Sequence, residues 1–473
     1  MSSSKKDASS FIQYTAAITA SLTALGYGLN LSWTSPVIPY LTSKKSHIPV
    51  TKEQCDLISS IFSIGLILGY LVNPIIIDRT SRKKTLLIYT FPQILSWLLI
   101  IFIKKFPSIL IGRIISGFGY GGAICGLTVY LSEIGTIKNR GIFLVMIPIF
   151  LNLGFLLVMI LGAFSTFDTL NLVMLMVPLI FCVTFVFMPD SSYFQRKNNI
   201  INNTNNKTGK NKKNNDDDNE KMMKLMNTDE MENYDRENEG NFKVGFKWNE
   251  MRIYKLVNNR NNQKALLIEI ILAATITLSG STPILFNTQQ LLSYSHFSLR
   301  AEECTIILAG ITIIACLLSI PLVERIKRKV ILLVSGILAT IGMLMVGVFF
   351  LMEYENYDVS KLRWMPLLGL TVYLFMNAFG FLNLFYIFQC ELFMSDVKSQ
   401  AVTISKITIT FFMFMALVRF QYLIDNLGLH VIFFLFATIS AVGTYLIFII
   451  TPETQGKSVE EIQLLLKTRK MFF

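Results

Sequence analysis

The chain has 473 residues, of which 52% are hydrophobic and 16% are charged, and its mean hydropathy is +0.52. An ordinary soluble domain carries about 25% charged residues, so this composition excludes that class and favours a membrane protein. The net charge of +12 does not indicate nucleic-acid binding, because the Lys and Arg residues gather in turns between apolar runs, as they do in polytopic membrane proteins.

Twelve apolar runs are long enough to cross the hydrocarbon core as helices, which takes about 20 residues each. Six runs precede and six follow one long polar stretch. We expect membrane helices at approximately 14–36, 57–77, 85–103, 108–131, 141–163, 170–188, 265–287, 304–323, 330–352, 364–388, 400–421 and 429–450. The first run is too long for the apolar region of a cleavable signal peptide, so we expect it to remain as a membrane helix.

These runs predict an all-α membrane protein made of two six-helix bundles. The expected units are an N-terminal bundle at 1–194, a polar loop at 195–263, a C-terminal bundle at 264–452 and a tail at 453–473. The loop is rich in Asn and too polar to fold alone, although short amphipathic helices in its second part remain an alternative to a simple tether. The Lys- and Arg-rich turns place both termini in the cytoplasm by the positive-inside rule.

One charged motif occurs twice, once in each half, in a turn after an apolar run. Asp78-Arg79-Thr80-Ser81-Arg82-Lys83 is matched by Glu324-Arg325-Ile326-Lys327-Arg328-Lys329. Two further matches follow, Glu133 with Glu391 and Pro189 with Pro452. The offsets are 246, 258 and 263 residues (324 − 78, 391 − 133 and 452 − 189). Parallel repeats of this kind are typical of a transporter whose binding site lies between its halves.

The sequence does not predict an enzyme. Its six cysteines and three histidines lack metal-ligand spacing, and no nucleophile is paired with a base. There is no Walker motif, and the glycines from Gly117 to Gly122 lie inside an apolar run with no lysine placed for phosphate. We therefore expect no metal, no cofactor and no use of ATP or nucleic acid.

Several motifs stand in one order along the chain. Besides the two charged turns they are Trp33-Thr34-Ser35-Pro36, Gly112-Arg113-x-x-x-Gly117-x-Gly119, Tyr130-x-x-Glu133 with Arg140-Gly141, Pro189-Asp190-Ser191-Ser192 and Pro452-Glu453-Thr454-Gln455-Gly456. With these motifs the chain resembles the sugar porter family of the major facilitator superfamily, and within it the insect facilitated trehalose and glucose transporters. The resemblance covers nearly the whole chain except the central loop. It implies twelve transmembrane helices in two pseudo-symmetric bundles.

The resemblance also implies a network of charges that closes the cytoplasmic side while the protein faces outward. Acids accompany the cations in both halves, which favours a gate over charges that only anchor the topology. The residues assigned to this gate are Asp78, Arg79, Arg82, Arg113, Glu133, Arg140, Glu324, Arg325, Arg328, Glu391, Lys398 and Glu453.

The amide side chains with which the family holds sugar hydroxyls are largely replaced in this chain. The glutamine positions of family helices 5 and 7 hold Pro148, Ile276 and Thr277, and the helix 10 tryptophan falls on Tyr386. Each remaining polar candidate has an alternative role as an interhelical hydrogen bond. The candidates for solute contact are Trp33, Asn152, Ser279, Thr282, Asn287, Thr312, Asn377, Asn383 and Tyr386.

The energy source is predicted from an absence. The family's helix 1 acid would fall on Gly28, and no Asp or Glu occurs between Phe11 and Leu41, while Glu269 is interpreted as a helix-end charge that faces the cytoplasm. We therefore expect facilitated diffusion of a sugar such as trehalose or glucose by a monomer in the lipid bilayer of the plasma membrane. The replaced amides leave two alternatives open, a transporter of another small solute and a non-transporting solute sensor on the same fold.

Overall fold

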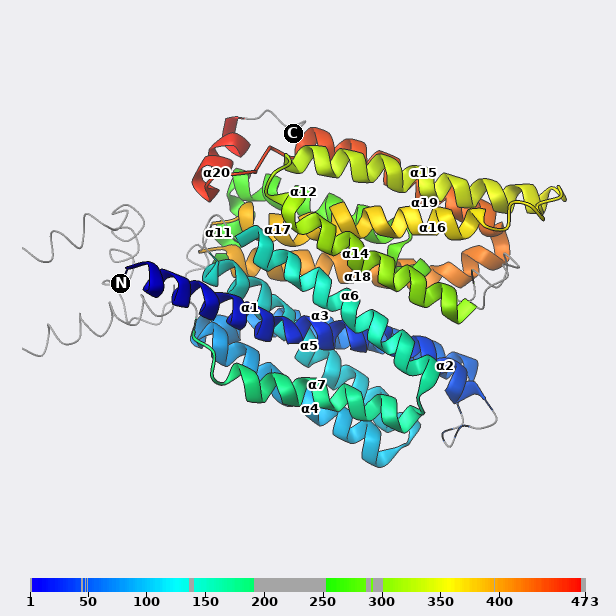
Figure 1. Ribbon diagram of the computed structural model, residues 1–473, viewed down its shortest axis with the longest axis horizontal. Helices are drawn as coiled ribbons and strands as arrows, with labels where there is room; N and C mark the ends of the chain where they lie inside the picture. Colours follow the sequence, from blue (N-terminus) through cyan, green and yellow to red (C-terminus); the bar gives the residue numbers. More distant parts are fainter. Residues whose placement is uncertain are drawn as a thin grey trace, which may run out of the picture.

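The computed structural model describes residues 2–43, 46, 48, 50–135, 140–190, 252–285, 291, 301–394 and 396–468. These residues are almost entirely helical, and the long helices run side by side (Figure 1). Eleven helices in this part of the chain are long and apolar enough to cross a membrane. The helix that contains the first predicted run is not among them, because Thr, Ser, Tyr and Gly dilute its apolar residues.

The first half begins with one long helix and a short one that continues it. The helices of this half are α1 (Ser2–Ser32), α2 (Thr34–Thr42), α3 (Lys52–Arg79), α4 (Arg82–Ile103), α5 (Phe106–Ile134), α6 (Arg140–Phe164) and α7 (Phe167–Phe185). The turn between α3 and α4 is only Thr80 and Ser81. The Ser81 hydroxyl accepts a hydrogen bond from the Lys84 backbone N–H at 3.2 Å and so caps α4.

The second half repeats this arrangement with two additions, a short helix before it and an amphipathic helix after it. Its elements are α11 (Arg252–Asn258), α12 (Arg260–Leu278), α14 (Ala301–Val323), α15 (Arg328–Tyr354), α16 (Met365–Met376), η2 (Asn377–Leu382), α17 (Asn383–Glu391), α18 (Lys398–Leu427), α19 (Leu429–Ile450) and α20 (Val459–Thr468). The predicted loop at 195–263 lies outside the described residues up to position 251, and α11 and the start of α12 fall in the rest of it.

The predicted run at 364–388 is not one α-helix. It is divided into α16, the π-helical turn η2 and α17. Gly380 sits in the π turn, where an added Cβ would meet the Ser335 hydroxyl oxygen at 2.1 Å, so α15 and this turn approach more closely than side chains would allow. Hydrophobic periodicity does not distinguish a π turn from an α turn, and such turns are frequent at functional sites.

Two glycines show how closely helices approach in the first half. A Cβ at Gly28 of α1 would lie 2.0 Å from the Leu151 carbonyl oxygen of α6, and one at Gly121 of α5 would lie 2.4 Å from the Leu66 carbonyl oxygen of α3. Small residues permit such backbone contact between membrane helices. Gly310 of α14 differs, since nothing lies within 4 Å of an added Cβ there.

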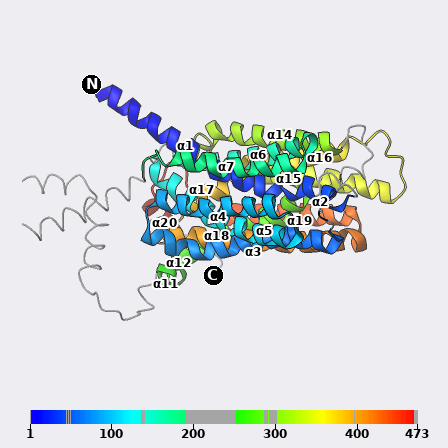
Figure 2. The ribbon, with the colours of Figure 1, turned by 90° about the horizontal axis from the view of Figure 1, so that it is seen from below.

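The two halves meet along one contact, which we call the seam. It is formed by α3 with α18, α6 with α14, and α5 with α17. The Cys390 thiol of α17, for example, donates to the Thr128 carbonyl of α5 at 3.8 Å. Both ends of the described chain lie at one end of the bundle, together with α11 and α20 (Figure 1). Figure 2 shows the same from a second side. The two charged turns lie at this same end, which we call the charged end.

The connections at the opposite end differ in length between the halves. Only Lys104 and Lys105 separate α4 from α5, whereas residues 355–364 separate α15 from α16. The longer connection extends beyond the neighbouring helices (Figure 1). It is held locally by Asp358, whose carboxylate accepts from the backbone N–H and the hydroxyl of Ser360. These two hydrogen bonds lower the pKa of Asp358 below its usual value.

Candidate functional site

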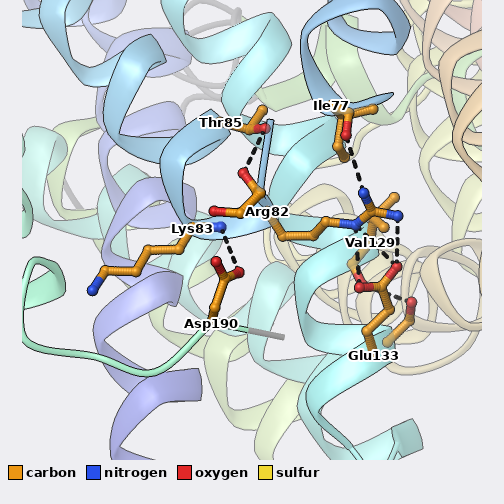
Figure 3. Close-up of polar contacts among 9 residues, drawn as sticks. Ile77, Arg82, Lys83, Thr85, Val129, Glu133 and Asp190 are labelled. Atoms are coloured by element: carbon orange, nitrogen blue, oxygen red, sulfur yellow. Dashed lines mark hydrogen bonds and ion pairs between the residues drawn. The ribbon is translucent and has the colours of Figure 1, made fainter. Parts of the chain in front are cut away.

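An arginine and a glutamate from neighbouring helices pair at the charged end of the first half. Arg82, the first residue of α4, donates to Glu133 of α5 from Nε at 3.1 and 3.2 Å and from Nη2 at 3.1 Å (Figure 3). Its Nη1 donates to the Ile77 carbonyl at the end of α3 at 3.0 Å. Both charged side chains are 13% exposed. A two-pronged pair of this burial holds three helices in one arrangement.

The end of the first half is tied to the same turn. The Asp190 carboxylate accepts from the Lys83 backbone N–H at 3.3 Å (Figure 3). The Tyr130 hydroxyl donates to the Pro189 carbonyl at 2.9 Å. A carboxylate at the first turn of α4 is also favoured by the positive end of the helix dipole.

The second half repeats both contacts at equivalent positions, because an offset of 246 residues carries Arg82 onto Arg328. Arg328 is 2% exposed, and its Nη2 lies 3.5 Å from Glu391 and 3.7 Å from Glu324. Glu453 accepts from the backbone N–H groups of Arg328 at 3.0 Å and Lys329 at 3.3 Å, as Asp190 does in the first half. The duplicated motif is therefore a duplicated contact between an arginine and an acid.

Glu324 links the two halves. An added Cβ on Gly141, in the first turn of α6, would lie 2.1 Å from the Glu324 Oε1 atom. Glu324, which belongs to the second half, thus contacts the first half across the seam. It also lies beside Arg328 of its own half. The side chains of Asp78 and Arg140, predicted to take part in this network, lie outside the described part of the chain.

The other predicted gate residues have different surroundings. Arg79 and Arg325, at equivalent positions of the two turns, are exposed, while Lys398 at the start of α18 is buried. Arg113 is not near these charges. It lies 20 residues before Glu133 on the same helix (133 − 113), which is about 30 Å at 1.5 Å per residue. The sequence grouped Arg113 with the charged end, and the structure places it toward the other end.

Arg113 has its own buried environment around the first helix. Its Nη1 donates to the Asn30 backbone carbonyl at 2.8 Å and to the Asn30 Oδ1 atom at 3.2 Å. The guanidinium lies 5.3 Å from the centroid of the Trp33 ring and 4.3 Å from that of Phe62. These aromatic faces and carbonyls stabilise a cation that is 1% exposed.

Trp33, predicted to contact solute, is fully buried within the first half. Its indole N–H donates to the Asn171 Oδ1 atom of α7 at 2.8 Å, and its ring packs edge-on against Trp97 of α4. The indole has only one donor, and Asn171 uses it.

We expect Trp33→Phe to lower the thermal unfolding midpoint of the purified protein, because it leaves the buried Asn171 oxygen without a donor. An unsatisfied buried acceptor costs about 1–3 kcal/mol of stability. Differential scanning fluorimetry in detergent measures this. The double variant Trp33→Phe/Asn171→Leu removes both partners and should recover much of the loss. Equal midpoints for Trp33→Phe and the wild type would contradict a packing role for this bond.

The remaining solute candidates differ in their surroundings. Three have protein partners: Asn152 donates to Cys316 Sγ across the seam at 3.7 Å, Ser279 shares a hydrogen bond with Tyr373 at 2.8 Å, and Thr312 donates to the Ala309 carbonyl at 2.7 Å. Asn377 and Asn383 each keep a buried side-chain oxygen without a partner in the described chain, although the Asn383 amide donates to Ser319 at 2.6 Å. Thr282 is buried, and Asn287 lies outside the described residues.

Tyr386 has a neighbour that the sequence interpretation missed. The Lys406 Nζ atom of α18 lies 3.7 Å from the centroid of the Tyr386 ring, and Lys406 is 3% exposed. A lysine in the middle of the apolar run at 400–421 was the available signal. Glu269 also differs from its interpretation as a helix-end charge, since it is 0% exposed and lies well inside α12.

Comparison with known proteins gives a consistent result. A model of the family described as sugar (and other) transporter matches residues 16–466. Facilitated trehalose transporter Tret1 of Culex quinquefasciatus is 25% identical over 454 residues, which are 96% of this chain and 85% of that protein. Tret1 of Drosophila pseudoobscura pseudoobscura is 26% identical over 452 residues, which are 95% of this chain but 51% of that protein, so the chain spans about half the length of that relative.

Solved structures of similar shape are also transporters by their titles. The major facilitator superfamily proton:xylose symporter XylE bound to 6-bromo-6-deoxy-D-glucose has a TM-score of 0.74 at 16% identity, over 97% of this chain and 99% of that chain. The inward-open form of the xylose transporter XylE from E. coli has a TM-score of 0.66 at 16% identity, over 96% of this chain and 99% of that one. At this identity the likeness shows the major facilitator fold, as the sequence predicted.

Proposed function

Because this chain belongs to the sugar transporter family, we propose that it moves a sugar such as trehalose or glucose across the plasma membrane by alternating access. One observation supports this proposal above the others. Each half carries the same arginine–glutamate pair at its charged end, Arg82 with Glu133 and Arg328 with Glu391. Two matched pairs at one end suit two rigid halves that rock about a site between them.

The geometry at the seam supports a reversible closure. Glu324 reaches Gly141 of the other half but is only partly buried, and its Arg328 contact of 3.7 Å is long. Partly exposed ion pairs contribute about 0–1 kcal/mol, so such a contact can open without a large barrier. The buried Arg328 beside it holds the second half together, as the Arg82–Glu133 pair holds the first, while the seam separates.

The energy source follows from the first helix. No Asp or Glu occurs between Phe11 and Leu41, and the only charged partner of this stretch in the described chain is Arg113, held by Asn30. We propose facilitated diffusion, in which the solute moves down its own gradient. The division into two bundles at 1–194 and 264–452, the cytoplasmic termini and the monomeric state belong to the same proposal.

A transporter of another small solute is the second candidate. It is favoured by the bonded state of Trp33 and Ser279, which leaves Asn377 and Asn383 as the polar candidates with an unpartnered oxygen in the described chain. A site with two amide oxygens suits a solute with fewer hydroxyls than a disaccharide has.

Uptake by expressing oocytes tests the proposal. Radiolabelled trehalose, glucose and a small panel of polyols are supplied at two external pH values, and surface protein is measured in parallel. We expect saturable sugar uptake that does not depend on pH. No uptake of any sugar by protein verified at the surface would refute the sugar proposal, and saturable uptake of a panel member alone would favour the second candidate.

Glu133→Gln and Glu391→Gln should each lower the maximal rate of uptake and leave surface expression nearly intact. The amide keeps the shape of the side chain but removes the charge that faces Arg82 or Arg328. The helices at the charged end are then held together less firmly. Initial rates normalised to surface protein measure the effect. Glu355→Gln, an exposed residue at the opposite end, is the matched control. Unchanged rates in both variants would contradict the gate.

A further inference from the structure

Two ionisable side chains lie deep inside the membrane-spanning helices of the second half. Glu269 is nine residues after the start of α12 at Arg260, about 14 Å along the helix, and Lys406 is eight residues after the start of α18 at Lys398, about 12 Å. They are 0% and 3% exposed. Charged residues at such depth are costly and are kept where they have a function.

The two side chains interact electrostatically but are not in direct contact. Lys406 and Glu269 affect each other's charge, yet no ion pair within 4.0 Å joins them in the described chain. The Ser405 hydroxyl, one residue before Lys406, is the polar group beside the Glu269 carboxylate, but within the same residues neither carboxylate oxygen has a hydrogen bond of normal geometry. A pair kept only for packing would be expected to close into a contact salt bridge, because a separated buried pair gains little from its neighbour.

Aromatic rings surround the lysine. Its Nζ atom lies 3.7 Å from the Tyr386 ring centroid and 5.0 Å from that of Phe385, both on α17. Tyr386 packs edge-on against Phe385. The ammonium is thus held by cation–π contact while its N–H groups remain available to a ligand.

The cluster faces the seam. Cys390, one turn after Tyr386 on α17, donates from its thiol to the Thr128 carbonyl of α5 at 3.8 Å. The helix that carries Lys406, α18, packs against α3 and α5, which belong to the first half, so the two halves meet beside this cluster. A solute that passes between the halves reaches this level when they separate.

We propose that Glu269, Lys406 and the Tyr386 ring form a binding site for an uncharged, hydroxyl-bearing solute. This inference rests on the proposed function and extends its site by two residues. The carboxylate offers two acceptors and the ammonium three donors, and this set of groups suits hydroxyl groups, which donate and accept at once. The opposite charges balance, which disfavours a solute with a net charge. The ring gives the C–H face of a sugar or polyol an apolar surface.

The double variant Glu269→Leu/Lys406→Met tests the site, because both replacements are uncharged and similar in volume. We expect it to reach the surface and to raise the KM for the sugar that the wild type carries by at least about tenfold, the effect of losing one or two charged hydrogen bonds. Glu355→Leu/Lys361→Met makes the same chemical changes at two exposed residues of the 355–364 connection and should keep the wild-type KM.

The outcomes separate the two proposals. An unchanged KM in the double variant, with normal wild-type uptake, overturns this site and leaves the proposed function standing. A variant with an unchanged KM but a lower maximal rate or a lower unfolding midpoint assigns the pair to structure, and one that alters only the pH dependence of uptake assigns it to a proton; both overturn the inference. Absence of wild-type uptake refutes the proposed function, and the inference falls with it.

Glu269→Gln provides a second test if the double variant does not reach the surface. It keeps the volume and one acceptor oxygen, and we expect a smaller rise in KM, of a few-fold, with an unchanged surface level. An unchanged KM in this variant overturns the site.

Discussion

Arg328→Leu is expected to reduce surface-normalised sugar uptake by at least about tenfold. Arg328 is 2% exposed and is the cation beside Glu391, which is itself buried. Removing one partner of a buried pair leaves the other charge uncompensated, which costs about 3–5 kcal/mol of free energy. A free-energy difference of 1.4 kcal/mol already corresponds to a factor of about ten in an equilibrium constant. The substitution should also lower the unfolding midpoint, because Glu391 is the last residue of α17 and the Arg328 contact holds that end of the helix in place.

The neighbouring arginine provides the control. Arg325 stands three residues earlier in the same motif but is exposed, and Arg325→Leu should change uptake by less than about twofold, as surface charges contribute little. The double variant Arg328→Leu/Glu391→Leu removes both charges and should regain the midpoint without regaining the rate. Equal losses in the two single variants would mean that position within the motif, and not burial, decides the role.

Gly28→Ala should destabilise the first half although alanine favours helices. The new Cβ would lie 2.0 Å from the Leu151 carbonyl oxygen, and a backbone atom cannot move aside as a side chain can. α1 and α6 must then separate, at a cost of about 1–3 kcal/mol or more for overpacking. The expected results are a lower unfolding midpoint in detergent and less protein at the cell surface.

Gly310→Ala is the matched change where space is open. It adds the same methyl group to a membrane helix, but nothing lies within 4 Å of it, so the gain in helix propensity of about 0.5–1 kcal/mol should keep or raise the midpoint. If the two alanine variants behaved alike, the close approach of α1 and α6 would not be what Gly28 provides.

The duplication in the sequence corresponds to a duplicated contact at the charged end, for a physical reason. Arg82 and Arg328 occupy the first turn of equivalent helices, and each has a glutamate in reach on a neighbouring helix, so matched spacing produced matched contacts. Most membrane helices followed from the length of their apolar runs, with ends that differ by a few residues. Their caps, such as Ser81 on α4, decide those ends.

The positions of other charged residues could not be predicted from the sequence and became clear only in the structure. The family resemblance assigned Arg113 to the cytoplasmic charge network together with Glu133, but the two residues lie near opposite ends of a helix of 29 residues, so Arg113 does not reach that network. Glu269 was interpreted as a helix-end charge because it lies near the start of an apolar run, whereas α12 begins at Arg260 and buries it. The absence of an acid at Gly28 has a structural reason too, since any side chain there meets α6.

The unequal connections at the end opposite the charges record how the two copies have diverged. The paired residues stand 51 positions apart in the first half (133 − 82) and 63 in the second (391 − 328), and most of the difference lies in the longer α15 and the connection at 355–364. The two halves therefore differ in length at this connection, whereas the two charged motifs have the same length. The same connection is the natural place to insert an epitope or a fluorophore, which would report the side of the membrane that this end faces without disturbing the charged end.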